Sequence, residues 1–124
     1  MENELRDISV QGLAHVGDAV FELMTRTWLC LGGTSTARKL HDRAIMLVSA
    51  KAQAAAAEKI VSLLTEEELS VYKRGRNTHV NSIPKASTQE EYHAATGIEA
   101  LFGFLYLSGK TDRLNELFGL ITGG

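Results

Sequence analysis

Proline occurs only once in this sequence of 124 residues, at Pro84. Proline lacks a backbone donor and clashes with the preceding helical turn, so its scarcity leaves most of the chain free to form helices. The chain is also rich in Ala and Leu and has no long alternation of Val, Ile and Thr. These features predict an all-α protein, and the length predicts a single compact domain over residues 1–124.

Apolar periodicity divides the first half of the chain into two helices. Helical spacing predicts one helix over about 9–31, ended by a pair of glycines. A second helix begins at Ser35 or Thr36, both good N-caps, and extends to about Leu64. It is long for a small domain, so we expect a break inside it, at a position that the pattern does not place.

The second half carries stronger capping signals. Thr65 and Glu68 have the form of a capping box that opens a short helix to about Lys73, with Gly75 as its stop. Residues 75–87 are polar and predict a loop.

Two more helices follow this loop. Ser87 or Thr88 caps an apolar helix through Leu107, and Thr111 or Asp112 starts a last amphipathic helix. We find no repeat, linker or second domain.

Composition excludes several classes of protein. One cysteine, Cys30, cannot form an internal disulfide, and its apolar neighbours predict a buried, inert thiol. The acidic N-terminus has no apolar segment typical of a signal peptide. No apolar stretch approaches the roughly 20 residues that a membrane-spanning helix needs. The sequence therefore predicts a cytoplasmic protein with no membrane partner.

Two acids stand out because apolar residues surround them: Asp18 in residues 14–21 and Glu99 in residues 94–103. A carboxylate on a packed helix is unfavourable unless it is paired or bound to a cation. The alternative is that both are ordinary exposed acids on the polar edges of their helices. Spacing alone does not separate the two interpretations.

Glycines near both acids offer a structural basis for the first interpretation, without deciding between the two. Gly17 adjoins Asp18, while Gly97 and Gly103 flank Glu99. Glycine inside a helix costs about 1 kcal/mol relative to alanine, and a close approach of two helices would compensate. If the two helices cross there, the carboxylates can face one another. Two convergent oxygen ligands completed by waters suit Mg²⁺ or Mn²⁺.

The segments around these acids resemble a known family. Gly17-Asp18-Ala19-Val20, followed later by Glu99-Ala100-Leu101-Phe102-Gly103, is similar to the two signature segments of ribonuclease III catalytic domains. The similarity is closer to the Mini-ribonuclease III branch, which lacks a separate domain that binds double-stranded RNA. Supporting segments lie at 40–41, 48–54 and 73–77.

The resemblance implies a function and a site. It implies a helical, homodimeric, Mg²⁺-dependent endonuclease that cleaves double-stranded RNA to 5′-phosphate and 3′-hydroxyl ends, with Mn²⁺ as a possible substitute metal. Asp18 and Glu99 would be its catalytic and metal-binding pair. It also implies maturation of large-subunit (23S) ribosomal RNA as the cellular role, and leaves open whether a ribosomal protein takes part.

The sequence departs from full-length ribonuclease III at two places. That family carries further acids where this chain has Ala14 and Thr96. Two expected protein carboxylates remain in place of four, which leaves the number of metals open. The Mini branch shares this reduction, so it does not indicate an inactive enzyme.

Neighbours of Asp18 have weaker claims on the site. Glu22 lies one helical turn from Asp18 and could be an outer metal ligand, but it can equally pair with Arg26, which we favour. His15 is turned away from Asp18 on a helix, so we expect no direct ligand role.

A basic run occupies residues 73–77 of a chain whose net charge is −2. Such asymmetry marks a local basic element on an acidic body. The simpler account is that these cations complement a helix C-terminus. Their number favours contact with RNA phosphates. His79 extends the patch, and the predicted RNA-binding residues are Lys73, Arg74, Arg76, Asn77, Lys85 and Lys51.

Two other functions remain open from the sequence. One is a catalytically weak RNA-binding or ribosome-assembly module on the same fold, and the other is a helical protein-interaction domain. For the dimer, the apolar residues Phe21, Met24 and Phe102 are candidates for the interface, with a place in the core of each protomer as an equal rival.

Overall fold

The computed structural model describes residues 5, 7–33, 36–78 and 88–123. Within these ranges all regular secondary structure is helical, which agrees with the predicted all-α class. The elements are α2 (Val10–Leu31), α3 (Ala37–Leu47), α4 (Ala50–Ile60), the 3-10 turn η1 (Val61–Leu63), α5 (Glu66–Arg76), α6 (Gln89–Leu107) and α7 (Thr111–Thr122). None of the helices in these ranges has the length and apolar character needed to cross a membrane.

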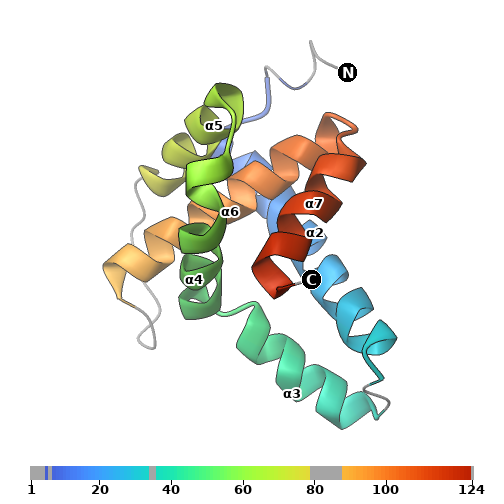
Figure 1. The fold of residues 1–124 in the computed structure, drawn as a ribbon. Helices are drawn as coiled ribbons and strands as arrows, with labels where there is room; N and C mark the ends of the chain where they lie inside the picture. The colour runs from blue at the N-terminus through green and yellow to red at the C-terminus, as the bar shows by residue number, and fades with distance from the viewer. Residues whose placement is uncertain (1–4, 6, 34–35, 79–87, 124) are drawn as a thin grey trace.

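Helix α6 forms the centre of the molecule. It packs against α2, α4, α5 and α7, and it runs through the middle of the ribbon in Figure 1. A helix that is apolar on nearly all sides is stable only when other helices surround it. Ile98, Leu101, Phe102 and Leu105 of α6 are accordingly completely buried. Helix α3 instead projects below the rest of the molecule and packs against α2 (Figure 1).

Glycines set the distance between α2 and α6. A Cβ atom on Gly17 would lie 1.6 Å from the carbonyl oxygen of Glu99, and one on Gly103 would lie 1.9 Å from that of Leu13. No other residue fits either position without moving a helix. Gly97 belongs to a different crossing, because a Cβ atom there would meet the ring of Tyr72 on α5 at 2.7 Å.

The expected break in the second long helix lies at Val48 and Ser49. Helix α3 ends with Val48 as its C-cap, and the Ser49 hydroxyl accepts the backbone N–H of Ala52 at 3.1 Å to cap α4. The predicted capping box of Thr65 with Glu68 is present at the start of α5. Thr88 caps α6 in the same way, with Glu91 as its partner.

The prediction that Gly75 ends a helix is wrong. Helix α5 continues through Gly75 to Arg76 and has Asn77 as its C-cap. Gly75 is buried against α6, where a Cβ atom would lie 2.7 Å from the Cβ of Ala100. In the sequence Gly75 looks like a glycine that ends a helix, but in the structure it allows α5 to pack closely against α6.

The predicted burial of Cys30 is also wrong, because its thiol is exposed. Leu29 takes the inward position at this end of α2, and the next residue on a helix is turned about 100° away.

Of the two rival places for the candidate interface residues, the structure selects the core of the protomer. Phe21 and Phe102 are both buried, and their ring centroids are 5.2 Å apart. Met24 packs against the same core cluster. Phe21 and Phe102 are therefore not accessible to a partner, and Met24 is only partly exposed.

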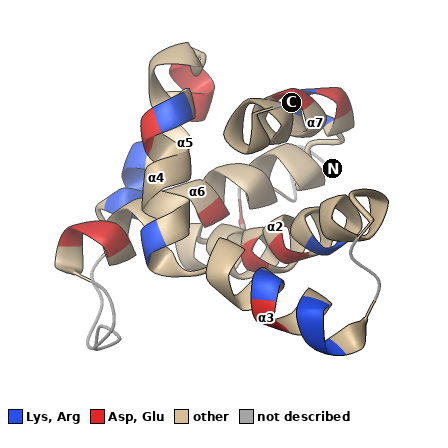
Figure 2. Cartoon of the chain, turned by 60° about the horizontal axis from the view of Figure 1, so that its bottom comes forward, with Lys and Arg blue, Asp and Glu red and all other residues tan. Residues whose placement is uncertain are grey.

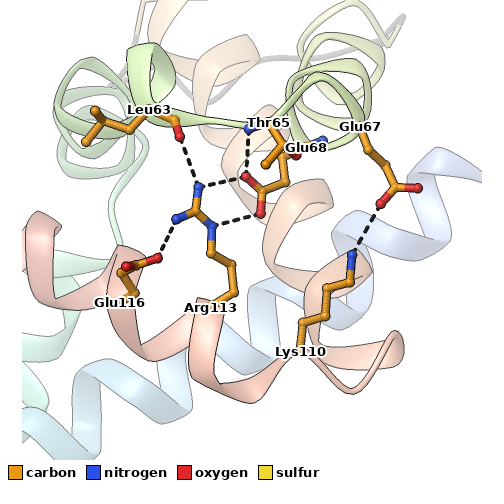
Figure 3. Close-up of polar contacts among 7 residues, drawn as sticks. All are labelled: Leu63, Thr65, Glu67, Glu68, Lys110, Arg113 and Glu116. Atoms are coloured by element: carbon orange, nitrogen blue, oxygen red, sulfur yellow. Dashed lines mark hydrogen bonds and ion pairs between the residues drawn. The ribbon is translucent and has the colours of Figure 1, made fainter.

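An ion pair ties α7 to α5 (Figure 3). Arg113 donates to both carboxylate oxygens of Glu68, from Nη2 at 2.8 Å and from Nε at 2.9 Å. Arg113 also donates to the carbonyl of Leu63 at 3.0 Å and to the Glu116 carboxylate. Because these hydrogen bonds favour the charged form, Arg113 holds the pKa of Glu68 below its usual value, although burial opposes this.

Candidate active site

The crossing of α2 and α6 brings Asp18 and Glu99 together. Gly17 immediately precedes Asp18 and rests on the backbone of Glu99, so the two acidic side chains leave the crossing on the same side. Both side chains line the same pocket, close enough for Asp18 to act on the ionisation of Glu99. Residues distant in the chain thus form one pair, and the close approach permitted by glycine is the reason.

A pocket of about 300 Å³ opens over this pair. Helices α2 and α6 supply most of its wall, and Thr78 closes one side. The lining residues are Gln11, Ala14, His15, Asp18, Thr78, Tyr92, Thr96 and Glu99. Asp18 is exposed at the mouth, whereas Glu99 is half-buried. A ligand can therefore approach from the side of Asp18.

The electrostatics of Glu99 are those of a carboxyl group without a cation. Burial, together with the hydrogen bond and charge of Asp18, raises the pKa of Glu99 to about 8, while a hydrogen bond from Gln53 opposes the rise. No Lys or Arg is among the described residues that line the pocket. An ion from outside the chain would relieve the repulsion between the two carboxylates.

The donor atoms fit a hard divalent cation. Carboxylate oxygens of Asp18 and Glu99 converge, and the hydroxyl groups of Thr78, Tyr92 and Thr96 are close by in the pocket wall. In the described part of the chain, no cluster of three or more His, Cys, Asp and Glu side chains could enclose a metal. Two protein ligands completed by water or phosphate oxygens suit Mg²⁺ better than Zn²⁺, which takes three or four protein ligands.

The positions that depart from full-length ribonuclease III both lie at this pocket. Ala14 and Thr96 line it, one turn from Asp18 and three residues from Glu99 respectively. His15 also lines the pocket, although helical spacing turns it away from Asp18. Glu22 does not line it, and its carboxylate pairs with Arg26 at 3.0 Å, as we favoured.

Gln53 on α4 is a residue of the site that the sequence did not single out. It is 2% exposed, and its Nε2 donates to the Val48 carbonyl at 2.9 Å and to the Glu99 carboxylate at 3.5 Å. The sequence offers two signals: Gln53 falls in segment 48–54, which supports the family resemblance, and it is a long polar side chain among the alanines of residues 50–57. Its direction toward Glu99 depends on how α4 packs against α6, which the sequence does not reveal.

The basic run lies on a helix more than on a loop. Lys73, Arg74 and Arg76 occupy the last turns of α5 and are exposed, and Asn77 caps them. The guanidinium of Arg76 lies 5.8 Å from the centre of the Tyr72 ring. Helix α5 therefore carries all three cations, although the sequence predicted a loop from residue 75 onward.

The basic end of α5 adjoins the pocket of Asp18 and Glu99. Thr78 lines that pocket, and its hydroxyl donates to the carbonyl of Arg74 at 2.9 Å. Lys73, Arg74 and Asn77 also line a separate open groove of about 680 Å³.

The remaining cations are more dispersed. Lys51 is exposed on α4, and His79 and Lys85 lie outside the described residues. Figure 2 shows Lys and Arg on α3, α4 and α5, with α3 and α5 at opposite ends of the molecule. Arg38, Lys39 and Arg43 of α3, which the sequence did not point to, thus form a second exposed basic group.

Comparison with known proteins identifies the family. The family model described as "Ribonuclease III domain" matches residues 11–110, a span that contains both Asp18 and Glu99. A solved structure of a protein from Fusobacterium nucleatum has the same fold, with a TM-score of 0.86 and 32% identity, covering 95% of this chain and 91% of that one.

Curated relatives narrow the assignment. Proteins named Mini-ribonuclease 3 are 38% identical in Clostridium tetani, covering 97% of this chain and 80% of the relative, and 43% identical in Symbiobacterium thermophilum, covering 85% and 81%. The chain therefore belongs to the ribonuclease III family, in its Mini-ribonuclease 3 branch.

Proposed function

We propose that this chain is a Mg²⁺-dependent endoribonuclease that cleaves double-stranded RNA, with Asp18 and Glu99 as its catalytic and metal-binding pair. The observation that carries the proposal is that both acids line one pocket whose described lining holds no Lys or Arg. Mg²⁺ or Mn²⁺ held there supplies activation of a water for in-line attack on the phosphodiester and stabilisation of the departing 3′ oxygen. The products carry 5′-phosphate and 3′-hydroxyl ends.

The position of each residue in the pocket suggests its role. Exposed Asp18 would hold the cation on the side open to the phosphate group, and half-buried Glu99 would hold it from the deep side of the pocket. The Tyr92 hydroxyl can donate to phosphate and ribose oxygens along the wall, whereas the hydroxyls of Thr78 and Thr96 already donate to the carbonyls of Arg74 and Tyr92.

The basic residues hold the backbone of the duplex. Lys73, Arg74, Arg76 and Asn77 lie at the end of α5 that leads through Thr78 into the pocket, so phosphates bound there are adjacent to the site of cleavage. Lys51 and Lys85 complete the predicted set. Such contacts position an RNA helix by its shape and charge and do not read its bases.

We also propose that two copies of the chain form a two-fold dimer, because one small site cuts one strand and two sites are needed across a duplex. Exposed apolar side chains on α2 and α3 support a partner there: Leu23 is 65% exposed, Leu31 83% and Met46 71%. Light scattering should give twice the mass of the chain. Leu31→Lys should yield monomers, whereas Leu120→Lys, at an exposed leucine of α7, should leave the dimer intact.

The cellular role follows from the family. We propose maturation of 23S precursor ribosomal RNA in the cytoplasm, with a ribosomal protein as a possible additional partner. The alternative is a catalytically weak RNA-binding or ribosome-assembly module on the same fold. Incubation of the protein with a long RNA duplex, with and without Mg²⁺, distinguishes the two: Mg²⁺-dependent shortening supports the nuclease, and binding without shortening supports the alternative.

A further inference from the structure

Helix α4 reaches the Asp18–Glu99 pair through Gln53. The side chain is 2% exposed, and its Nε2 lies 3.5 Å from the Glu99 Oε2 and 2.9 Å from the Val48 carbonyl oxygen. The Val48 carbonyl can only accept a hydrogen bond, so the nitrogen end of the amide must face it. The same nitrogen is thereby directed at Glu99.

The break between α3 and α4 makes this arrangement possible. In an uninterrupted helix the Val48 carbonyl would accept the N–H of Ala52. Here the Ser49 hydroxyl accepts that N–H at 3.1 Å, which leaves the Val48 carbonyl to hold the amide of Gln53. The interruption between α3 and α4 therefore affects the site, because it fixes the position of the Gln53 side chain that contacts Glu99.

Stability alone does not account for a glutamine at this position. The Oε1 atom of Gln53 is buried and has no hydrogen-bond partner among the described residues. An unpaired buried amide oxygen costs about 1–3 kcal/mol, which offsets the roughly 0.5–1.5 kcal/mol that the hydrogen bond to the Val48 carbonyl contributes, so the fold gains little from a glutamine here. We therefore expect the buried amide of Gln53 to have a role at the neighbouring carboxylates.

We propose that Gln53 is a positioning residue for Glu99. Its amide fixes the orientation of the carboxylate by holding Oε2, so that the group is presented to Asp18 and to a divalent cation in one geometry. At 3.5 Å the Gln53–Glu99 hydrogen bond is long and therefore weak, so we expect it to orient the carboxylate without stabilising it strongly. The inference rests on the proposed role of Asp18 and Glu99 as metal ligands.

Gln53→Met tests this, because methionine has a similar length and no donor. Replacing an outer partner of a metal ligand typically lowers metal affinity or activity by about 10- to 100-fold. We expect the Mg²⁺ concentration for half-maximal cleavage of an RNA duplex to rise by about 10-fold or more. Mn²⁺ binding to the RNA-free protein, followed by the electron paramagnetic resonance of free Mn²⁺, should weaken by a similar factor. Duplex binding without metal should be unchanged.

Thr25→Val is the matched control, since Thr25 is a buried polar residue of α2 that lies outside the pocket. It should leave both metal measurements at their wild-type values. Gln53→Leu serves as a second apolar variant if methionine prevents folding.

The inference is overturned if the folded Gln53 variants show wild-type Mn²⁺ affinity, whether cleavage is unchanged or reduced equally at every Mg²⁺ concentration. Asp18→Asn, measured in parallel, separates this from failure of the proposed function. If Asp18→Asn still cleaves, the proposed metal pair is wrong. If Asp18→Asn is inactive and the Gln53 variants bind Mn²⁺ normally, only the role of Gln53 is wrong.

Discussion

Glu68 and Glu99 both turn inward, but their charges are balanced in opposite ways. Glu68 on α5 is 3% exposed and receives two hydrogen bonds from Arg113, which hold its pKa below the usual value. Glu99 on α6 is half-buried beside Asp18, and burial and this neighbour raise its pKa to about 8.

The difference separates a structural acid from a site. Where the chain supplies the cation itself, as for Glu68, the pair joins two helices and leaves no charge to bind a ligand. Asp18 and Glu99 are close together, and no Lys or Arg lines the described part of their pocket. Such an arrangement lowers the stability of the fold, which is typical of a site that binds a ligand.

The largest effect is expected from Asp18→Asn. The variant keeps the shape of the side chain but removes a charge that the metal needs, so several kcal/mol of transition-state stabilisation is lost. Cleavage of an RNA duplex in Mg²⁺ should fall by about a thousandfold or more, while binding of the duplex persists. A gel assay under single-turnover conditions measures both, and a near wild-type rate would remove Asp18 from the mechanism.

The next effect concerns the structural pair. Arg113→Met leaves Glu68 buried without its cation, which should lower the free energy of unfolding by about 3 kcal/mol. Urea denaturation at pH 7 measures it. Lys110→Ala is the control, since the Lys110–Glu67 pair at 3.3 Å is exposed and should contribute less than about 1 kcal/mol. Equal effects of the two variants would mean that burial does not strengthen the Glu68–Arg113 pair.

A smaller effect of opposite sign is expected for Glu99→Gln without metal. The raised pKa of Glu99 means that its stabilising contribution is complete below about pH 4.5 and is lost as the pH rises to about 8. The variant should therefore be more stable than the wild type at pH 8, by about 1 kcal/mol, with a smaller difference at pH 5. Thermal unfolding at the two pH values checks this; a destabilised variant at pH 8 would contradict it.

Glu68 should show the reverse dependence. Its lowered pKa means that its contribution is complete above about pH 4.5 and is lost as the pH falls below that value. The advantage of the wild type over Arg113→Met should therefore shrink in acid.

The smallest effect is expected at the basic end of α5. Replacing Arg74 and Arg76 with Ala should weaken duplex binding and flatten its dependence on salt, by about 0.9 in the log–log slope for each phosphate that the protein no longer neutralises, a value that applies to B-form DNA. The weakening should be similar for duplexes of different sequence. Fluorescence anisotropy over a series of salt concentrations measures it, and an unchanged slope would reduce these arginines to a helix end.

Local signals explain what could be predicted from the sequence. The caps at Thr65 and Thr88 and the ends of α2 and α6 depend on residues within one turn, and the structure has them where they were expected. The glycines suggested that Asp18 and Glu99 lie close together. Glycine inside a helix is unfavourable unless a second helix crosses closely over it, as α6 does at Gly17.

Properties that depend on which face meets which neighbour could not be predicted. Gly75 resembles a helix stop until Ala100 is placed against it, and Cys30 resembles a core residue until Leu29 takes the inward position. Gln53 looks like any polar residue of an alanine-rich helix, because its partner Glu99 is on another helix. These assignments require the packing of the whole domain.

We expect the Asp18–Glu99 pair to bind a divalent cation from outside the chain. The most direct test is calorimetric titration of the RNA-free protein with Mn²⁺ at pH 7, in buffers of different ionisation enthalpy. Because the pKa of Glu99 is about 8, its carboxyl group is mostly protonated at this pH, so binding should release about one proton. Asp18→Asn and Glu99→Gln should both abolish binding. Binding that releases no proton, or that survives in either variant, would contradict the account.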